Sequence, residues 1–148
     1  MIHIVAFQES FHDRLVEIWC QAVRHTHHFL AEEDFQFFHE MVKGGVLREV
    51  ELWVAVNGEQ EPVGFIGLDG SKVEMLFVDP AFHGKGTGRQ LLQHAERLKG
   101  SVLRVDVNEQ NAGARVFYER YGFRVEGRSE QDSSGRPYPL LHLALSRE

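Results

Sequence analysis

The feature of the sequence that most constrains its fold is a glycine-rich turn between a strand pattern and a helix pattern. Residues 84–88 read GKGTG, an apolar strand pattern at 73–78 precedes them, and a helical pattern of leucines follows. Glycine reaches backbone conformations with positive φ and lets a ligand approach the bare main chain. The first N–H groups of a helix have no partner within it and carry a partial positive charge. Strand, turn and helix start together therefore predict an anion site, most naturally for phosphate.

The spacing of these glycines matches neither of two common nucleotide-binding motifs. A Walker loop, G-x-x-x-x-G-K-[S/T], is absent, and a dinucleotide fingerprint, G-x-G-x-x-G/A, would need a small residue where Arg89 stands. A turn selected only for its tightness is the structural alternative. The basic side chains of Lys85 and Arg89 favour the anion site, because a purely structural turn has no need of them.

Periodicity along the rest of the chain predicts a single domain over residues 1–148, of the α+β class. We expect one central mixed sheet of about seven strands with helices on both faces. Only the strands at 73–78 and 102–107 are expected to be parallel, because a crossover helix connects them. Ser10 and Asp13 form a capping-box-like start for the first helix. The expected strands lie at 2–7, 51–56, 63–68, 73–78, 102–107, 123–125 and 140–145, and the helices at 10–23, 32–43, 88–99 and 111–121.

The charge balance and the single cysteine argue against several classes of function. With 16 basic and 22 acidic residues the formal net charge is −6, which argues against DNA or RNA as a main partner. Cys20 fits the apolar face of the first helix, and no Cys/His cluster has zinc-ligand spacing. No apolar run approaches the about 18 residues of a membrane span, and the N-terminal strand is too short for a signal peptide. We expect a cytoplasmic protein, monomer or homodimer, with no metal, nucleic-acid or membrane partner.

The segment around the glycine turn and a second segment after it carry a resemblance to a known family. Residues 76–92, LFVDPAFHGKGTGRQLL, resemble motif A of the GNAT superfamily of N-acetyltransferases, whose pattern R/Q-x-x-G-x-G/A binds the pyrophosphate of coenzyme A. Residues 111–123, NAGARVFYERYGF, resemble the family's next motif, N-x-x-A-x-x-F-Y-x-x-x-G-F. Segments 26–30, 52–57 and 137–141 are similar to a small bacterial type within that superfamily, so the resemblance covers nearly the whole chain. The sequence departs from this pattern at His83, which occupies the position of the family's Arg or Gln. A neutral histidine donates one hydrogen bond, whereas an arginine guanidinium is charged and donates several.

The resemblance implies direct transfer of an acetyl group from acetyl-CoA to an amine of a small molecule or a protein. It implies that acetyl-CoA lies where the strands 73–78 and 102–107 splay apart, with pantetheine paired to the first of them. Turn residues would bind the pyrophosphate through backbone N–H groups. The residues expected to bind acetyl-CoA are Phe77, Val78, His83, Gly84, Lys85, Gly86, Thr87, Gly88, Arg89, Asn108, Asn111 and Phe117.

Tyr118 is the candidate general acid for the departing thiolate. A tyrosine pKa of about 10 keeps the hydroxyl protonated at neutral pH. A packed core aromatic is the alternative, because Tyr118 shares helical spacing with its apolar neighbours. For the base, Glu74 is a candidate because it alternates away from Val73 and Met75, and an ordinary exposed carboxylate or a water chain is equally open.

The acceptor site is the part of the chain on which the sequence is least informative. His27 and His28 follow the first helix, where the family places substrate contacts, and histidine suits proton transfer. Phe29, Leu30 and Tyr138 are candidates for the acceptor pocket on position alone. A non-catalytic acyl-CoA-binding or sensing domain and a phosphate- or nucleotide-binding module are the competing functions.

Overall fold

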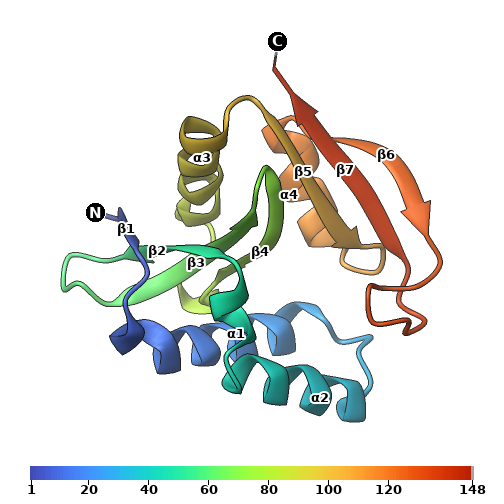
Figure 1. The fold of residues 1–148 in the computed structure, drawn as a ribbon, viewed down its shortest axis with the longest axis horizontal. Helices are drawn as coiled ribbons and strands as arrows, with labels where there is room; N and C mark the ends of the chain where they lie inside the picture. Colours follow the sequence, from blue (N-terminus) through green and yellow to red (C-terminus); the bar gives the residue numbers. More distant parts are fainter. Residues whose placement is uncertain (148) are drawn as a thin grey trace.

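The computed structural model describes residues 1–147, and it confirms the α+β class with one mixed sheet (Figure 1). The sheet order is β1-β2-β3-β4-β5-β7-β6, and β4–β5 is its parallel pair. Nearly all the expected elements lie within a few residues of their predicted bounds. The strands are β1 (His3–Ala6), β2 (Glu51–Val56), β3 (Pro62–Asp69), β4 (Lys72–Val78), β5 (Val102–Asn108), β6 (Arg124–Ser129) and β7 (Leu140–Ser146), and the helices are α1 (His12–Thr26), α2 (Glu32–Lys43), α3 (Thr87–Lys99) and α4 (Ala112–Tyr121).

Helices cover both faces of the sheet, and each face has its own hydrophobic core. Helices α1 and α2 lie along one face, and α3 and α4 lie on the other (Figure 1). Strand β3 runs between the two cores, so Phe65 packs with the α1–α2 cluster while Ile66 packs with the α3–α4 cluster. This double cover explains why β3 is buried along nearly its whole length rather than at alternate residues.

The parallel pair β4–β5 is joined only at its beginning. Lys72 pairs with Arg104 and Val73 with Val105, and the register stops there. Towards its carboxyl end β4 remains paired with β3 on one edge only, since Gly64 pairs with Val78. The two parallel strands therefore separate in the middle of the sheet, and the splay expected from the family resemblance is confirmed.

The expected start of the first helix is wrong. Helix α1 begins at His12 behind a 3-10 turn, Glu9–Phe11, and no side chain caps either element. Ser10 lies inside that turn, so its hydroxyl is not at the capping position. Strand β6 is also longer than expected and reaches Ser129, because the polar residues after Val125 pair with β7 at the sheet edge.

Candidate active site

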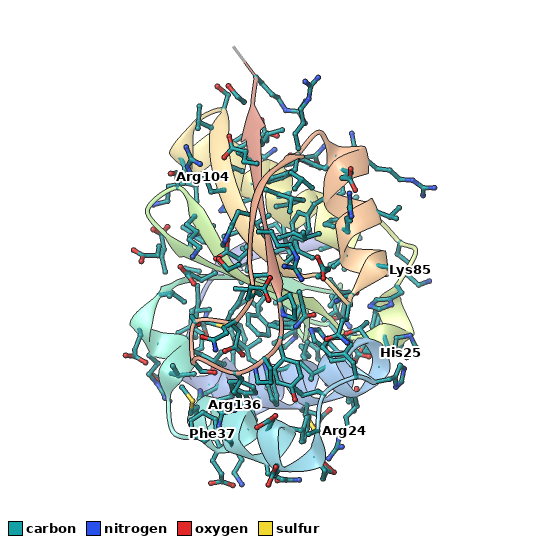
Figure 2. All side chains as sticks on the ribbon, turned by 90° about the vertical axis from the view of Figure 1, so that its right-hand side faces the viewer. Arg24, His25, Phe37, Lys85, Arg104 and Arg136 are labelled. Atoms are coloured by element: carbon teal, nitrogen blue, oxygen red, sulfur yellow. The ribbon has the colours of Figure 1, made fainter. Side chains whose placement is uncertain are left out.

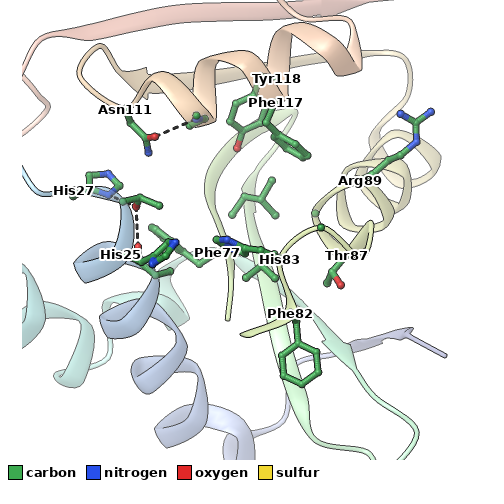
Figure 3. A pocket seen from close by; sticks show the side chains of 18 of the residues that line it. His25, His27, Phe77, Phe82, His83, Thr87, Arg89, Asn111, Phe117 and Tyr118 are labelled. Carbon is green, nitrogen blue, oxygen red and sulfur yellow. Dashed lines mark hydrogen bonds between the residues drawn. The ribbon is translucent and has the colours of Figure 1, made fainter. Parts of the chain in front are cut away.

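A large cavity of about 780 Å³ lies where β4 and β5 separate. Its walls are the end of β4, the glycine turn with the first residues of α3, the start of α4 and the last turn of α1 (Figure 3). Four segments that are distant in the sequence thus meet at one place, and the splay of the sheet opens the space between them. We call this space the large cavity.

The glycine turn presents bare backbone to the large cavity. Gly84 and Gly86 have φ values of +77° and +79°, and a Cβ at either position would have no atom within 4 Å. A side chain at these positions would therefore be strained and would project into open space. Gly88 has a different reason to be glycine, because its Cβ would lie 3.1 Å from Cζ of Phe117. The turn is shaped for close approach of a ligand on one side and of α4 on the other.

The start of α3 supplies unpaired hydrogen-bond donors. The first hydrogen bond of the helix joins the N–H of Gln90 to the carbonyl of Gly86 at 3.0 Å, so the N–H groups of residues 87–89 have no helical acceptor. The hydroxyl of Thr87 is buried and has no hydrogen-bond partner among residues 1–147. Donors of this kind, at the positive end of a helix dipole, fit an anionic diphosphate.

The free edge of β4 supplies a second row of backbone groups. The N–H of Asp79 donates to the carbonyl of Val63 on β3 at 2.8 Å. Because successive N–H groups of a strand point to opposite edges, those of Leu76 and Val78 face the gap towards β5. Both residues line the large cavity. This edge is suited to pair with an extended, amide-containing ligand such as pantetheine.

Tyr118 lies in the wall that α4 contributes. Its side chain is only 6% exposed, and its ring packs edge-on against Phe117 and Phe123 at centroid distances of 5.2 and 5.3 Å. The hydroxyl points towards the open space of the large cavity (Figure 3). Burial raises the pKa of Tyr118 far above its usual value, so the hydroxyl keeps its proton at neutral pH. The residue is thus both packed in the core and placed to donate a proton.

A second space, the small cavity of about 220 Å³, lies on the α1–α2 side of β4. Most of its wall is apolar, and its few polar groups come from the α1–α2 loop, β5 and the β6–β7 loop. His27 and Phe77 line both cavities, so their side chains belong to the wall that the two spaces share. The lining residues are Trp19, Val23, His27, Leu30, Phe38, Met41, Val42, Val46, Phe77, Asn108, Asp132 and Tyr138.

Most residues expected to bind acetyl-CoA line the large cavity, and two do not. Lys85 is exposed and projects into solvent (Figure 2). Asn108 lines the small cavity instead, and its Oδ1 accepts a hydrogen bond from the N–H of Gln110 at 3.0 Å. Asn111 caps α4 by accepting from the N–H of Ala114. The expected residues that line the large cavity are Phe77, Val78, His83, Gly84, Gly86, Thr87, Gly88, Arg89, Asn111 and Phe117.

The acceptor candidates separate into two groups. His27, Leu30 and Tyr138 line the small cavity, whereas His28 and Phe29 line neither cavity. The ring of Phe29 packs between those of His27 and Tyr138, with centroid distances of 5.2 and 6.1 Å. Phe29 therefore supports the wall from behind.

Tyr138 also anchors the β6–β7 loop. Its hydroxyl donates to Asp34 of α2 and accepts from the N–H of Ala31, and Arg136 donates to the same carboxylate at 2.8 Å. Arg136 lies over the ring of Phe37 on α2, with its Cζ 4.1 Å from the ring centroid (Figure 2). These contacts hold the loop against α2, and both elements line the small cavity.

The structure places Glu74 outside both cavities. Glu74 is the extra residue of a β-bulge, because Leu68 pairs with Val73 while Gly67 pairs with Met75. Val73 consequently belongs to the α3–α4 core and Met75 to the α1–α2 core. The regular alternation of side chains along this strand, from which Glu74 was predicted to act as the base, is therefore wrong. The carboxylate of Glu74 lies 3.5 Å from the ammonium group of Lys72.

Sequence reasoning missed residues that only the tertiary structure brings to the site. His25 lines the large cavity and meets His83 edge-on at a centroid distance of 5.5 Å. Its helical spacing from Ala22, another lining residue, was the available signal. The apolar wall of the small cavity gave no signal, because Val23 and Phe38 show the same periodicity as ordinary core residues.

Two kinds of feature do not occur within residues 1–147. No helix in this range is long and apolar enough to cross a membrane. No group of three or more His, Cys, Asp or Glu side chains within the same range is arranged to hold a metal ion.

The chain belongs to the GNAT family of acetyltransferases, since residues 19–138 match the acetyltransferase (GNAT) domain. It is an N-acetyltransferase that uses acetyl-CoA to acetylate an amine. It is 44% identical over 144 residues to the peptidyl-lysine N-acetyltransferase YjaB of Escherichia coli K12, covering 95% of this chain and 97% of YjaB. The YjaB of Salmonella typhimurium LT2 is 43% identical over 143 residues, with 97% of each chain covered. The solution structure of apo-form YjaB from Escherichia coli superimposes with a TM-score of 0.91 over 98% of this chain and 97% of that one.

Proposed function

We propose that this enzyme acetylates the side-chain amine of lysine in peptides or proteins. Acetyl-CoA occupies the large cavity, and the lysine side chain enters through the small cavity. The observation that carries the proposal is that His27 and Phe77 line both cavities, so a thioester in one space and an amine in the other would lie next to each other. Two relatives that match along almost their whole length bear the name peptidyl-lysine N-acetyltransferase.

The chemistry of the small cavity fits a lysine side chain. A volume of about 220 Å³ bounded by Trp19, Val23 and Phe38 can hold the four methylenes of lysine. Such walls remove hydration from an ammonium group and lower its pKa, so they favour the neutral amine that must attack. Asp132 contributes one carboxylate to the lining. That charge attracts a cationic side chain before it is desolvated.

The large cavity orients the acetyl donor. The glycine turn and the N–H groups at the start of α3 bind the pyrophosphate, and the free edge of β4 at Leu76 and Val78 pairs with pantetheine. When bound, acetyl-CoA supplies a thioester carbonyl that an amine can attack. The outward N–H groups of β4 lie where they can polarise that carbonyl, and holding both partners in place is worth an effective molarity of about 10⁵ M or more.

Tyr118 completes the transfer as general acid. The amine nitrogen forms a bond to the carbonyl carbon, the carbon–sulfur bond breaks, and the phenolic proton passes from Tyr118 to the departing sulfur. The raised pKa of Tyr118 keeps this proton on the oxygen at neutral pH, so it is available when negative charge develops on the sulfur. Lys85, Asn108, His28 and Glu74 have no part in these steps.

The test combines calorimetry with acetylation of defined peptides. Purified protein should bind coenzyme A at low salt, and should acetylate a peptide with a blocked N-terminus and a single lysine. The same peptide with ornithine, one methylene shorter, should react more slowly because its amine does not reach the wall that the two cavities share. Absence of coenzyme A binding would overturn the donor site. Thiol release with small amines but none with lysine peptides would overturn the acceptor, and binding without any release would indicate a sensing domain.

The single domain over residues 1–148, the cytoplasmic location and the monomeric or homodimeric state stay predictions. Acetylation of intracellular proteins would fit a cytoplasmic location, and limited proteolysis with a single stable fragment would fit a single domain. Size-exclusion chromatography with light scattering tests the third.

A further inference from the structure

His27 stands in the wall that the two cavities share. It follows Thr26 at the carboxyl end of α1, and its backbone N–H still donates to the carbonyl of Val23 at 2.8 Å. Its half-buried ring lines both cavities, and it comes from the end of α1, whereas Tyr118 comes from α4 (Figure 3). A side chain in this position can reach an amine that arrives through the small cavity.

A hydrogen-bond chain fixes which ring nitrogen of His27 carries the proton. The hydroxyl of Thr26 donates to the carbonyl of Ala22 at 2.8 Å (Figure 3). The same oxygen lies 2.7 Å from Nδ1 of His27. A hydroxyl has one hydrogen, and here the carbonyl takes it, so the Thr26 oxygen must accept from Nδ1–H. Nε2 of His27 is then left with a free lone pair.

The ring of His27 is also uncharged. Burial, with a smaller contribution from neighbouring His28, lowers the pKa of His27 to about 4. The other titratable groups that line the two cavities include Tyr118, His25, His83 and Arg89 around the large one, with Tyr138 and Asp132 around the small one. At neutral pH the ring is therefore an acceptor of hydrogen bonds at Nε2 and not a second cation beside the incoming amine.

Another histidine shows by contrast what a purely structural ring looks like. Both nitrogens of His142 are engaged, Nδ1 with Asp106 at 2.7 Å and Nε2 with the hydroxyl of Ser129 at 2.6 Å. None of these three residues lines either cavity. His142 uses both of its ring nitrogens in cross-strand contacts, whereas His27 keeps one nitrogen free and its ring lines both cavities.

We propose that Nε2 of His27, kept unprotonated by Thr26, accepts the hydrogen bond of the acceptor amine and receives its proton as the amide forms. This role rests on the proposed function, since it needs an amine in the small cavity. Thr26 acts as a positioning residue, because it touches neither reacting atom and works through the tautomer of His27.

The reaction transfers two protons, one from the amine to His27 and one from Tyr118 to the departing sulfur. The neutral amine donates one N–H to Nε2 while its lone pair points at the thioester carbon. As the carbon–nitrogen bond gains amide character its N–H becomes strongly acidic, so a weak base such as His27 suffices to take the proton. Tyr118 gives a proton to sulfur in the same event. The protonated His27 and deprotonated Tyr118 then exchange one proton through solvent, which restores both residues.

The decisive experiment tests the roles of the two ring nitrogens of His27 separately. His27→Asn keeps a donor at the Nδ1 position and removes the Nε2 acceptor, so turnover with a lysine peptide should fall roughly tenfold or more while acetyl-CoA affinity is retained. Thr26→Val removes the tautomer lock and should lower turnover in the same direction, and Thr26→Ser, which restores the hydroxyl, should recover most of it. His3→Gln, on β1 and outside both cavities, is the histidine control.

A spectroscopic measurement reports the tautomer independently of activity. In a ¹⁵N-labelled protein, long-range ¹H–¹⁵N correlation should show Nδ1 of His27 protonated and Nε2 unprotonated at neutral pH, and Thr26→Val should reverse or mix the two. Full turnover in His27→Asn, or a proton on Nε2 in the wild type, would overturn the proposal while lysine acetylation stands. A wild type that binds acetyl-CoA but acetylates no lysine peptide would overturn the proposed acceptor and with it the role of His27.

Discussion

The two cavities share His27 and Phe77 in their walls, but they are built in opposite ways. The large cavity owes its binding groups mainly to backbone, along one nearly continuous stretch from Leu76 to Arg89 with α4 placed beside it. The small cavity is a collection of side chains from α1, α2, β4, β5 and two loops. A site made of backbone depends on a few residues that permit its conformation, whereas a site made of side chains depends on how distant elements pack.

The largest expected effect comes from Tyr118, which donates the proton that completes the transfer between the two sites. Tyr118→Phe removes the phenolic proton but keeps the ring that packs against Phe117 and Phe123. Loss of a general acid should lower turnover about 100-fold. Acetyl-CoA affinity, measured by calorimetry, should stay close to that of the wild type. Equal turnover of the two proteins would remove Tyr118 from the mechanism and leave it as a core residue.

Changing a glycine of the backbone-built site should affect donor affinity alone. In Gly86→Ala the left-handed conformation costs about 1–2 kcal/mol, so the turn relaxes and acetyl-CoA binding should weaken roughly tenfold. Gly70→Ala is the matched control, because Gly70 also has positive φ, +59°, and a Cβ there would have no atom within 4 Å, but it lies in the β3–β4 turn. Equal loss of affinity in both variants would mean that general destabilisation, not the turn, explains the effect.

The difference between a cavity built from backbone and one built from side chains also explains which features could be predicted from the sequence. Strand, glycine turn and helix start are consecutive in the chain, so the turn with its positive-φ glycines and the helix start could be located from local pattern alone, and the diphosphate that we propose for them stays a prediction. Sheet content and helix positions followed from periodicity for the same reason. Glu74 could not be placed correctly, because a bulge depends on the register with β3, which the sequence of one strand does not contain.

The small cavity is the part of the site that could not be predicted from the sequence. Trp19 on α1 and Val42 on α2 each follow the apolar periodicity of their own helix. This periodicity is the same for a core position and for a position in a cavity wall. Only the way α1 and α2 pack against β4 decides which of them border empty space. The free nitrogen of His27 depends on a hydrogen bond from Thr26 to Ala22 as well, which is visible only once the helix end is formed.

Filling the side-chain-built site should affect the acceptor alone. Met41 lines the small cavity on α2 and is 43% exposed. In Met41→Trp the larger indole takes up space near the mouth, and displacing about one methylene of the acceptor costs about 0.8 kcal/mol, so KM for a lysine peptide should rise about fourfold. Leu98→Trp is the control, since Leu98 on α3 is 44% exposed and lines neither cavity. A matching rise in the KM of acetyl-CoA would show that the two cavities are not separate sites.

The smallest expected effect tests the one side chain that departs from the family pattern in the backbone-built site. His83 is exposed at the edge of the large cavity and contacts the ring of His25. In His83→Arg a guanidinium faces the bound pyrophosphate, and charge-assisted hydrogen bonds are stronger than neutral ones. The gain is limited at an exposed position by solvent screening and by the entropy of a long side chain, so acetyl-CoA affinity should increase only about threefold.

Salt dependence distinguishes this gain from an effect of shape. An exposed ionic contact is screened over a Debye length of about 8 Å at physiological ionic strength and about 3 Å at 1 M. The advantage of His83→Arg should therefore disappear as salt is raised, while the weaker binding of Gly86→Ala persists at every salt concentration. If His83→Arg instead binds more weakly than the wild type, the contact between His83 and His25 is itself part of the donor site. The backbone would then not be sufficient on its own, and the contrast between the two cavities would be one of degree.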